Sequence, residues 1–237
     1  MSTGTPPSIH VVIPCAGVGL RAGAAGPKQY ATLAGKPLVA HTVEAFLCTD
    51  LIDRHIVVLA PTDQSWPLNH ARLELVQKGG ETRAQSVKAG LSHLVATGAR
   101  LDDWVLVHDA ARCLIQPAEI ERLIEVCLRE NRGGLLAMPL ADTLKQADAA
   151  GRAIGTVDRD LKWLAQTPQM FRLGELLQAL SGSMADITDE ASAMERQGDA
   201  PLLVEGSVTN FKVTYPSDFG LAEAVLAART AAQKENT

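Results

Sequence analysis

The sequence has few aromatic residues, no closely spaced cysteines and no long apolar run, and each shortage argues against a class of function. Aromatic residues make up 4% of the 237 residues, which is too few for a carbohydrate-stacking groove or a platform for single-stranded nucleic acid. The four cysteines, Cys15, Cys48, Cys113 and Cys127, show no CxxC spacing and no neighbouring histidine cluster, which argues against zinc. No run of about 18 apolar residues is present, and we therefore expect no transmembrane helix.

The chain also lacks a surplus of positive charge. Its 22 lysines and arginines are outnumbered by 27 aspartates and glutamates, which gives a net charge of −5 at pH 7. This balance argues against nucleic acid as a partner, so a site for a polyanion must be a local group of basic residues. The first residues, MSTGTPPS, contain neither the basic nor the apolar part of a secretory signal. Because scattered cysteines also suit a reducing compartment, we expect a cytoplasmic protein with no membrane or nucleic-acid partner.

Apolar runs of strand length alternate along the chain with amphipathic stretches of helical length. The expected strands are residues 9–13, 55–60, 73–76, 104–107, 135–138, 202–204 and 211–213. The expected helices are residues 37–47, 82–96, 117–131, 173–181, 188–197 and 217–233. Such alternation predicts βαβ units. We therefore expect one α/β domain over residues 1–237, with a mostly parallel sheet covered by helices on both faces.

One segment interrupts this alternation. Residues 139–160, PLADTLKQADAAGRAIGTVDRD, are polar and have a central turn at residues 149–152. The alternating residues on either side of that turn predict a β-hairpin that projects from the main sheet. Because such an arm has no core of its own, we expect it to pack on a second subunit; a solvated surface hairpin is the alternative.

The stretch VVIPCAGVGLRAG, residues 11–23, is typical of a buried strand that runs into a glycine-rich phosphate loop. Gly17 and Gly19 let backbone N–H groups approach an anion closely. No helix begins inside the loop, the next strand lacks a terminal acidic residue and no G-K-[ST] follows, which disfavours dinucleotide and Walker loops. Arg21 and Lys28 instead place two cations there, which suits a triphosphate, although two solvated loop charges are the alternative.

Asp109 ends the apolar run of VLVHDAAR. Ligands of an open α/β sheet bind outside the carboxyl ends of its strands, so this carboxylate is expected at the binding edge. It either provides a hard oxygen ligand for Mg²⁺ bridging nucleotide phosphates or caps the next helix. Arg112 is expected to contact a phosphate or Asp109, and His108 to be a packing residue and not a base.

Three further segments carry polar residues of interest. In GGETRAQS, Gly80 and Ser86 are placed to contact a base or ribose, and Thr82 is the expected N-cap of the next helix. In NFKVT, Lys212 lies between apolar residues and therefore needs an anionic partner. In ITDEA, the acidic pair favours the first turn of a helix, with Thr188 as the simplest cap.

The order of these motifs resembles that of one enzyme family. P-x-A-G-x-G-x-R, P-K-Q-Y, G-G-E-x-R-x-x-S-V, V-H-D-A-A-R, T-P-Q-x-F, T-D-E-A-S and N-x-K-V-T are together similar to the 2-C-methyl-D-erythritol 4-phosphate cytidylyltransferases of non-mevalonate isoprenoid synthesis. The resemblance extends over about residues 9–226. It implies a Rossmann-like nucleotidyltransferase fold, CTP and methylerythritol phosphate as substrates, Mg²⁺ or another divalent cation as cofactor, and a homodimer formed through the 139–160 arm.

The resemblance also implies roles for single residues. Arg21 and Lys28 would hold the triphosphate and stabilise the transition state, with Lys212 as a third catalytic cation. The residues implied to line the nucleotide are Cys15, Ala16, Gly17, Gly19, Gly80, Glu81, Ser86, Asp109 and Ala110, with Asp109 near the metal. The residues implied to bind methylerythritol phosphate are Arg112, Thr167 and Lys212, together with Thr143 and Arg159 from the arm of the other subunit.

Three other functions are weighed against this one. A cytidylyltransferase for another polyol phosphate, such as ribitol 5-phosphate, would share most of the motifs. An NAD(P)-binding oxidoreductase is disfavoured by the irregular loop and the missing acidic residue at the strand end. A non-catalytic nucleotide-binding protein would not explain why Arg21, Lys28, Asp109 and Lys212 are all present.

Overall fold

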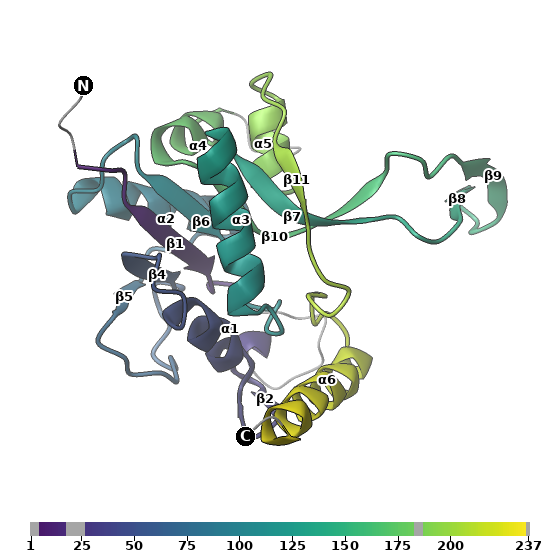
Figure 1. Ribbon diagram of the computed structural model, residues 1–237, viewed down its shortest axis with the longest axis horizontal. Coiled ribbons are helices and arrows are strands. Elements are labelled where there is room, and N and C mark those ends of the chain that lie inside the picture. Colours follow the sequence, from purple (N-terminus) through teal and green to yellow (C-terminus); the bar gives the residue numbers. More distant parts are fainter. Residues whose placement is uncertain (1–4, 18–26, 183–186, 236–237) are drawn as a thin grey trace.

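A computed structural model describes residues 5–17, 27–182 and 187–235 of the chain. Within these ranges its main sheet has seven strands in the order β11-β7-β10-β6-β1-β4-β5 (Figure 1). The strands are β1 (Ile9–Pro14), β4 (Arg54–Val58), β5 (Leu73–Val76), β6 (Trp104–Val107), β7 (Gly134–Pro139), β10 (Trp163–Arg172) and β11 (Leu202–Glu205). Only β10 runs antiparallel to its neighbours β6 and β7, so the sheet is mostly parallel, as predicted.

Helices cover both faces of the sheet because its central strands are apolar on both sides. Val11, Val12 and Ile13 of β1 are fully buried, and successive side chains of a strand point to opposite faces. Val11 and Ile13 join one core cluster, whereas Val12 joins the other. The helices of the first cluster are α1 (Leu38–Leu47) and α3 (Pro117–Glu130), and those of the second are α2 (Arg83–Ala96), α4 (Leu173–Ala179) and α5 (Glu190–Glu195).

A third, smaller cluster lies under the C-terminal helix α6 (Pro216–Glu235) and includes Leu114, Val213 and Ala222. The strand expected at residues 211–213 is wrong, because this segment is irregular. The N–H of Val213 donates to the carbonyl of Ala111 at 2.9 Å, and its side chain is buried in the cluster. Phe211 and Val213 are spaced as in a strand and both pack on this cluster, but the backbone that carries them is not a strand.

Short elements connect β1 with the first helix. The 3₁₀ turn η2 (Lys28–Tyr30) is followed by the two-residue strands β2 (Thr32–Leu33) and β3 (Lys36–Pro37), which pair with each other. Leu33 is fully buried and belongs to the cluster under α6. Through Leu33, these elements pack the segment that precedes α1 against the C-terminal helix α6.

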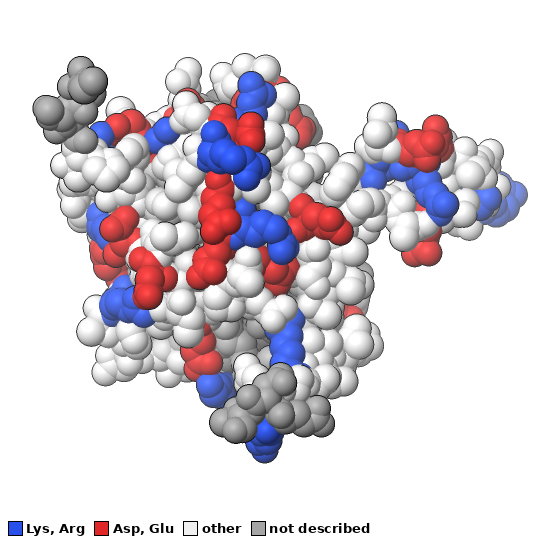
Figure 2. All heavy atoms as spheres, viewed as in Figure 1, with Lys and Arg blue, Asp and Glu red and all other residues white. Residues whose placement is uncertain are grey.

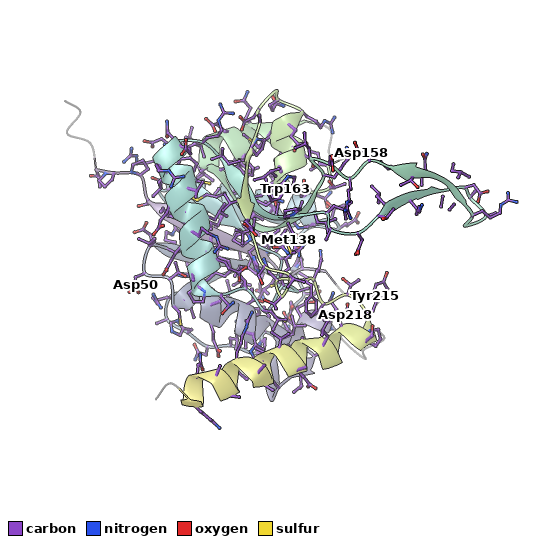
Figure 3. All side chains as sticks on the ribbon, turned by 45° about the vertical axis from the view of Figure 1, so that its right-hand side comes forward. Asp50, Met138, Asp158, Trp163, Tyr215 and Asp218 are labelled. Carbon is purple, nitrogen blue, oxygen red and sulfur yellow. The ribbon has the colours of Figure 1, made fainter. Side chains whose placement is uncertain are left out.

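The predicted hairpin is present and projects from the body of the molecule (Figure 1). Its strands β8 (Leu144–Ala147) and β9 (Ala153–Val157) form a separate two-stranded sheet. The connection uses Gly151, whose φ of 77° lies in the left-handed region. Figure 3 shows Met138 and Trp163 at the base of the arm, where β7 and β10 leave the body, and Asp158 on the returning segment.

The surface charge is mixed on the face shown in Figure 2, where lysines and arginines alternate with aspartates and glutamates over the body and the arm. The described residues on this face therefore form no broad basic surface to which a polyanion would bind. In the described part of the chain, no helix combines the length and apolar character that a membrane span requires.

Candidate active site

A cavity of about 270 Å³ opens at the carboxyl ends of β1 and β6, where a ligand site of such a sheet is expected. It gathers residues from segments far apart in the sequence. The predicted residues among its lining are Cys15, Ala16, Gly17, Lys28, Gly80, Glu81, Ser86, Asp109, Ala110 and Lys212. Gly19 and Arg21 lie outside the described residues, so their roles stay predictions.

Two turns approach each other closely at one wall of this cavity. A Cβ atom on Gly79 would lie 2.2 Å from the Cβ of Ala16, which requires glycine at this position. On the other side, the buried amide of Gln29 donates to the carbonyls of Cys15 at 2.7 Å and Gly17 at 2.9 Å. Both carbonyls therefore have a hydrogen-bond donor within the chain, and Gln29 fixes the start of the loop at the cavity wall.

The thiol of Cys15 takes no part in this wall. Its side chain belongs to a core cluster and is 2% exposed. Burial raises the pKa of the thiol well above its usual value, so it stays protonated. Cys15 therefore contributes backbone to the cavity, and a small side chain of another type would serve equally well.

The start of α2 forms the second wall. Thr82 is the N-cap, as predicted, and shares a capping box with Gln85. The hydroxyl of Ser86 accepts from the N–H of Gly80 at 3.1 Å and donates to the carbonyl of Thr82 at 3.1 Å. Ser86 thus braces the turn from inside, while Glu81 is exposed at the rim.

Asp109 is one of four charged side chains that hydrogen bonds join in a row. Its Oδ1 accepts from Nε of Arg83 at 2.6 Å, and its Oδ2 accepts from Nζ of Lys212 at 2.7 Å. The two terminal nitrogens of Arg83 donate in turn to the two carboxylate oxygens of Glu190, at 2.6 and 2.9 Å. We call Glu190, Arg83, Asp109 and Lys212 the charge chain.

The charge chain is buried enough for its attractions to dominate. Asp109 is 8% exposed and Glu190 is 1% exposed. Burial alone would raise the pKa of Asp109, but attraction to Arg83 and Lys212 outweighs it and holds this pKa well below its usual range. Burial likewise opposes the charge of Arg83, whose pKa is nevertheless raised by Glu190 and Asp109. Asp109 and Arg83 are therefore both charged at neutral pH.

A second cavity of about 200 Å³ lies on the other side of the charge chain and shares Arg83, Asp109 and Lys212 with the first. It is also lined by Arg112 and Thr167, both predicted to bind the phosphorylated substrate. Arg112 donates to the carbonyls of Asn210 at 2.8 Å and Ala165 at 3.2 Å. The guanidinium is thereby held at the cavity wall by backbone groups.

His108 is a packing residue, as expected. Its Nε2 lies 3.2 Å from the carbonyl oxygen of Arg112, which can only accept, so Nε2 carries the proton. The other nitrogen, Nδ1, then accepts from the Thr167 hydroxyl at 3.1 Å, and that hydroxyl accepts from the N–H of Asp109 at 3.0 Å. Burial lowers the pKa of His108 to about 3, and the ring packs on Phe46. The imidazole is neutral and orients Thr167.

Arg83 and Glu190 were not expected as site residues from the sequence. Both occur inside the motifs G-G-E-x-R and T-D-E-A-S, but nothing in the sequence pairs two residues 107 positions apart. The expected cap of α5 is also wrong, because Asp189 and not Thr188 accepts from the N–H of Ser192 at 2.9 Å. With Asp189 as the cap, Glu190 occupies the first turn and faces inward.

The arm residues do not line either cavity of their own chain. Thr143 and Arg159 are exposed, and the guanidinium of Arg159 donates to the carbonyl of Ala141 within the arm. The arm points away from the body (Figure 1), so these residues cannot reach the cavities of their own chain in this arrangement. Their assignment to the site of another subunit stays a prediction.

Asp109 fits a role as ligand of one divalent cation. Each of its oxygens accepts one hydrogen bond in the structure and has a second lone pair. Among the described residues no group of three or more histidines, cysteines, aspartates or glutamates could hold a metal by itself. A cation here would therefore take its other ligands from phosphate oxygens and water, which is how Mg²⁺ commonly binds with nucleotides.

Solved structures of related proteins have the same fold. A crystal structure of 4-diphosphocytidyl-2C-methyl-D-erythritol synthase is 37% identical, with a TM-score of 0.82 over 94% of this chain and 100% of that one. The Francisella tularensis 2-C-methyl-D-erythritol 4-phosphate cytidylyltransferase is also 37% identical, with a TM-score of 0.78 over 91% of this chain and 98% of that one. The predicted nucleotidyltransferase fold is thereby confirmed.

Curated relatives are more similar still. The 2-C-methyl-D-erythritol 4-phosphate cytidylyltransferase of Chromobacterium violaceum is 51% identical over 92% of this chain and 97% of its own length. A bifunctional enzyme IspD/IspF of Albidiferax ferrireducens is 56% identical over 95% of this chain, which spans 54% of that protein. These relatives favour neither a ribitol 5-phosphate enzyme nor an oxidoreductase.

A family profile covers nearly the whole chain. The profile of 2-C-methyl-D-erythritol 4-phosphate cytidylyltransferase matches residues 9–228. This range includes both cavities, the charge chain and the arm. The chain belongs to the 2-C-methyl-D-erythritol 4-phosphate cytidylyltransferase family.

Proposed function

We propose that the protein transfers CMP from CTP to 2-C-methyl-D-erythritol 4-phosphate. A phosphate oxygen of the acceptor attacks the α-phosphorus of CTP, and a new P–O bond forms. The bond from the α-phosphorus to the oxygen bridging it to the β-phosphorus breaks, and pyrophosphate leaves with that electron pair. The products are 4-diphosphocytidyl-2-C-methyl-D-erythritol and pyrophosphate.

The observation that carries this proposal is the position of the charge chain between two cavities. The larger cavity is lined by Ala16 and Gly17 and by Lys28 and suits the nucleotide, while the smaller is lined by Arg112 and suits the acceptor phosphate. Lys212 borders both cavities, so an attacking phosphate and an α-phosphate placed in them would meet beside its ammonium, while Arg83 is paired with Glu190 and Asp109. A direct displacement between two bound anions needs this arrangement.

Electrostatics, more than proton transfer, limits such a reaction. A phosphate monoester is already mostly ionised near pH 7, so no general base is required. This agrees with a neutral His108 whose nitrogens are both occupied by hydrogen bonds. Two polyanions repel each other strongly in a site of low dielectric, so fixed cations supply the main stabilisation of the transition state. We assign that role to Lys28 and Lys212, with Arg21.

Mg²⁺ is the cofactor that the site would use, held by Asp109 and the phosphate oxygens of CTP. When bound, Mg²⁺ neutralises phosphate charge and polarises the α-phosphate. The residues of the chain orient the nucleotide: the backbone at Ala16 and Gly17 faces its phosphates, while Gly80 and Ser86 shape the turn that would contact the base.

The arm completes the site in a homodimer. Thr143 and Arg159 of one chain would contact the methylerythritol phosphate bound by the other. Two features support this role: β8 and most of β9 are exposed, and large apolar side chains at Leu161 and Leu164 stand in solvent at the base of the arm. A second subunit would cover such side chains.

A reducing compartment, the cytoplasm, suits the protein. All four cysteines lie within the described residues and carry free thiols. Such thiols persist where reductants keep disulfides from forming.

The proposed function is tested by following pyrophosphate release from Mg²⁺, CTP and methylerythritol phosphate. Parallel reactions replace CTP by ATP, GTP or UTP, and the acceptor by ribitol 5-phosphate. We expect release with CTP and methylerythritol phosphate to exceed every other pair by at least about tenfold, since polar groups that read a base reject the wrong one strongly. No release above background with this pair would contradict the proposal, and faster release with ribitol 5-phosphate would reassign the acceptor.

A further inference from the structure

We propose that Glu190 is a positioning residue of the reaction: it limits Arg83 to a single hydrogen bond with Asp109 and so keeps one oxygen of Asp109 available to the active site. This inference rests on the proposed function, because it gives a task to a buried residue of that site. Glu190 lines neither cavity and would act only through Arg83.

The hydrogen-bond geometry of Arg83 carries the inference. A guanidinium offers its donors in a fixed fork, and its strongest pairing with a carboxylate uses two parallel hydrogen bonds. In the structure Glu190 receives this pairing, through both terminal nitrogens of Arg83. Only Nε remains directed at Asp109, and it reaches only Oδ1. The second oxygen, Oδ2, is left to Lys212.

Without the carboxylate of Glu190, the two terminal nitrogens of Arg83 would need another partner. Asp109 is the carboxylate within reach, because it already contacts Nε of the same side chain. Rotation of the guanidinium would place two hydrogen bonds on Asp109 and occupy both of its oxygens. Arg83 would then take one of the two acceptor positions of Oδ2, so that Lys212 and a cation shared with CTP would compete for the other.

Glu190 can impose this geometry because its own backbone is fixed. Asp189 caps α5, and the amide of Gln169 on β10 donates to the Asp189 side chain at 2.9 Å. The side-chain oxygen Oε1 of the same Gln169 amide accepts from the backbone N–H of Ala191 at 2.7 Å. The first turn of α5 is thereby tied to the sheet on both sides of Glu190, so the carboxylate does not follow Arg83 toward Asp109.

The test compares three variants: Glu190→Gln, the double variant Arg83→Gln with Glu190→Gln, and the control Ser192→Ala. Glutamine keeps the shape of Glu190 but offers one acceptor in place of two, which releases Arg83. In the double variant no guanidinium remains to occupy Asp109. Ser192→Ala removes half of the capping box of α5 and leaves the charge chain intact, so it reports the effect of loosening the helix alone.

We expect kcat of Glu190→Gln to fall by at least about tenfold, with a higher Mg²⁺ concentration for half-maximal rate. The double variant should recover at least about threefold over Glu190→Gln, because the competing guanidinium is gone. Ser192→Ala should keep the wild-type rate. Equal rates for Glu190→Gln and Ser192→Ala, or a double variant no faster than Glu190→Gln, would overturn the inference.

A binding measurement separates this inference from the proposed function. Calorimetric titration with CTP and Mg²⁺ needs no turnover, and Glu190→Gln should bind more weakly than wild type and Ser192→Ala. If wild-type protein released no pyrophosphate, the proposed function would fail, while weaker binding by Glu190→Gln would still support the inference. Wild-type affinity in Glu190→Gln would contradict it even in an active enzyme.

Discussion

The body of the molecule and the arm place polar side chains in opposite ways. In the body, Asp109 is held from three sides by Arg83, Lys212 and the hydroxyl of Thr167 at its backbone N–H. In the arm, Arg159 is exposed and bonded within its own hairpin. A side chain on an isolated two-stranded hairpin has no surrounding core to fix its direction. The difference supports the proposal that the acceptor site is completed by a second subunit, whereas the nucleotide residues that the structure describes come together within one chain.

Mixing two inactive variants tests whether the arm serves its own chain or the partner chain. Arg159→Ala and Asp109→Asn should each lower turnover by about 100-fold, since each removes a charged group at a reacting phosphate. In a mixture of subunits, heterodimers would contain one site with both residues intact. About a quarter of the wild-type rate should return if subunits reassort at random. A mixture as slow as its components would show that each arm acts on its own chain.

Lowering the pH should reduce the free energy of unfolding of the body because of His108. Its folded pKa of about 3 lies below the usual 6.5, so the unfolded chain takes up a proton that the folded chain does not. Its contribution to stability is complete above pH 6.5 and is lost as the pH falls. Between pH 6.5 and 5 this amounts to about 2 kcal/mol.

Urea unfolding at several pH values measures this effect. His108→Gln should show a smaller loss of stability over that range than wild type, whose His10 and His55 also have pKa values lowered by burial. The arm variant Asp148→Asn should keep the wild-type slope, because the pKa of that carboxyl lies below its usual value and its charge does not change over this range. Identical slopes for His108→Gln and wild type would show that His108 is not buried as a neutral ring.

Lys28→Ala should reduce turnover by at least about tenfold, or about 1.4 kcal/mol of barrier. Lys28 lines the nucleotide cavity, and its ammonium donates to the carbonyl of Val213. The rate of pyrophosphate release at saturating substrates measures the effect, and Lys36→Ala, at an exposed ion pair with Glu44, is the control. An unchanged kcat would remove Lys28 from the transition state.

Alanine substitutions at two matched glycines should have the smallest effect, and they test whether the body and the arm unfold separately. Gly98 in the body and Gly151 in the arm both have positive φ, at 100° and 77°, and open space where a Cβ would stand. Alanine at either position costs about 1 kcal/mol of backbone strain.

The strain should reach different parts of the molecule. Gly98→Ala should lower the melting temperature by about 2–4 °C. Gly151→Ala should leave it unchanged but speed amide hydrogen exchange in β8 and β9, because the arm forms a separate sheet. A lower melting temperature for Gly151→Ala would show that the arm unfolds together with the body.

The fold was predictable where local pattern and tertiary role agree. The six helices expected from apolar periodicity match α1 to α6 within a few residues, and Thr82 caps α2 as its position indicates. β10 could not be anticipated in this way. It contains Pro168, which is unusual in a central strand, and its register with β7 shifts between Ala165 and Gln169.

The candidate site was predictable as a set of segments but not as a set of contacts. Asp109, at the end of an expected strand, could be placed at the binding edge from topology alone, whereas Lys212 lies in an irregular segment and its contact with Asp109 could not. The pairing of Arg83 with Glu190 depends on how α2 and α5 pack on the same face of the sheet. A buried ion pair between distant helices leaves no local signal in the sequence.

One reversed strand has a consequence for how this enzyme could diversify. Because β10 runs antiparallel to β7, the connection between them leaves and re-enters the sheet at a single edge, beside the cavities. That connection can lengthen, shorten or change composition without altering any other strand pairing. Under the role proposed for the arm, exchange of this hairpin would change acceptor specificity and leave the strands that carry the nucleotide site unaltered.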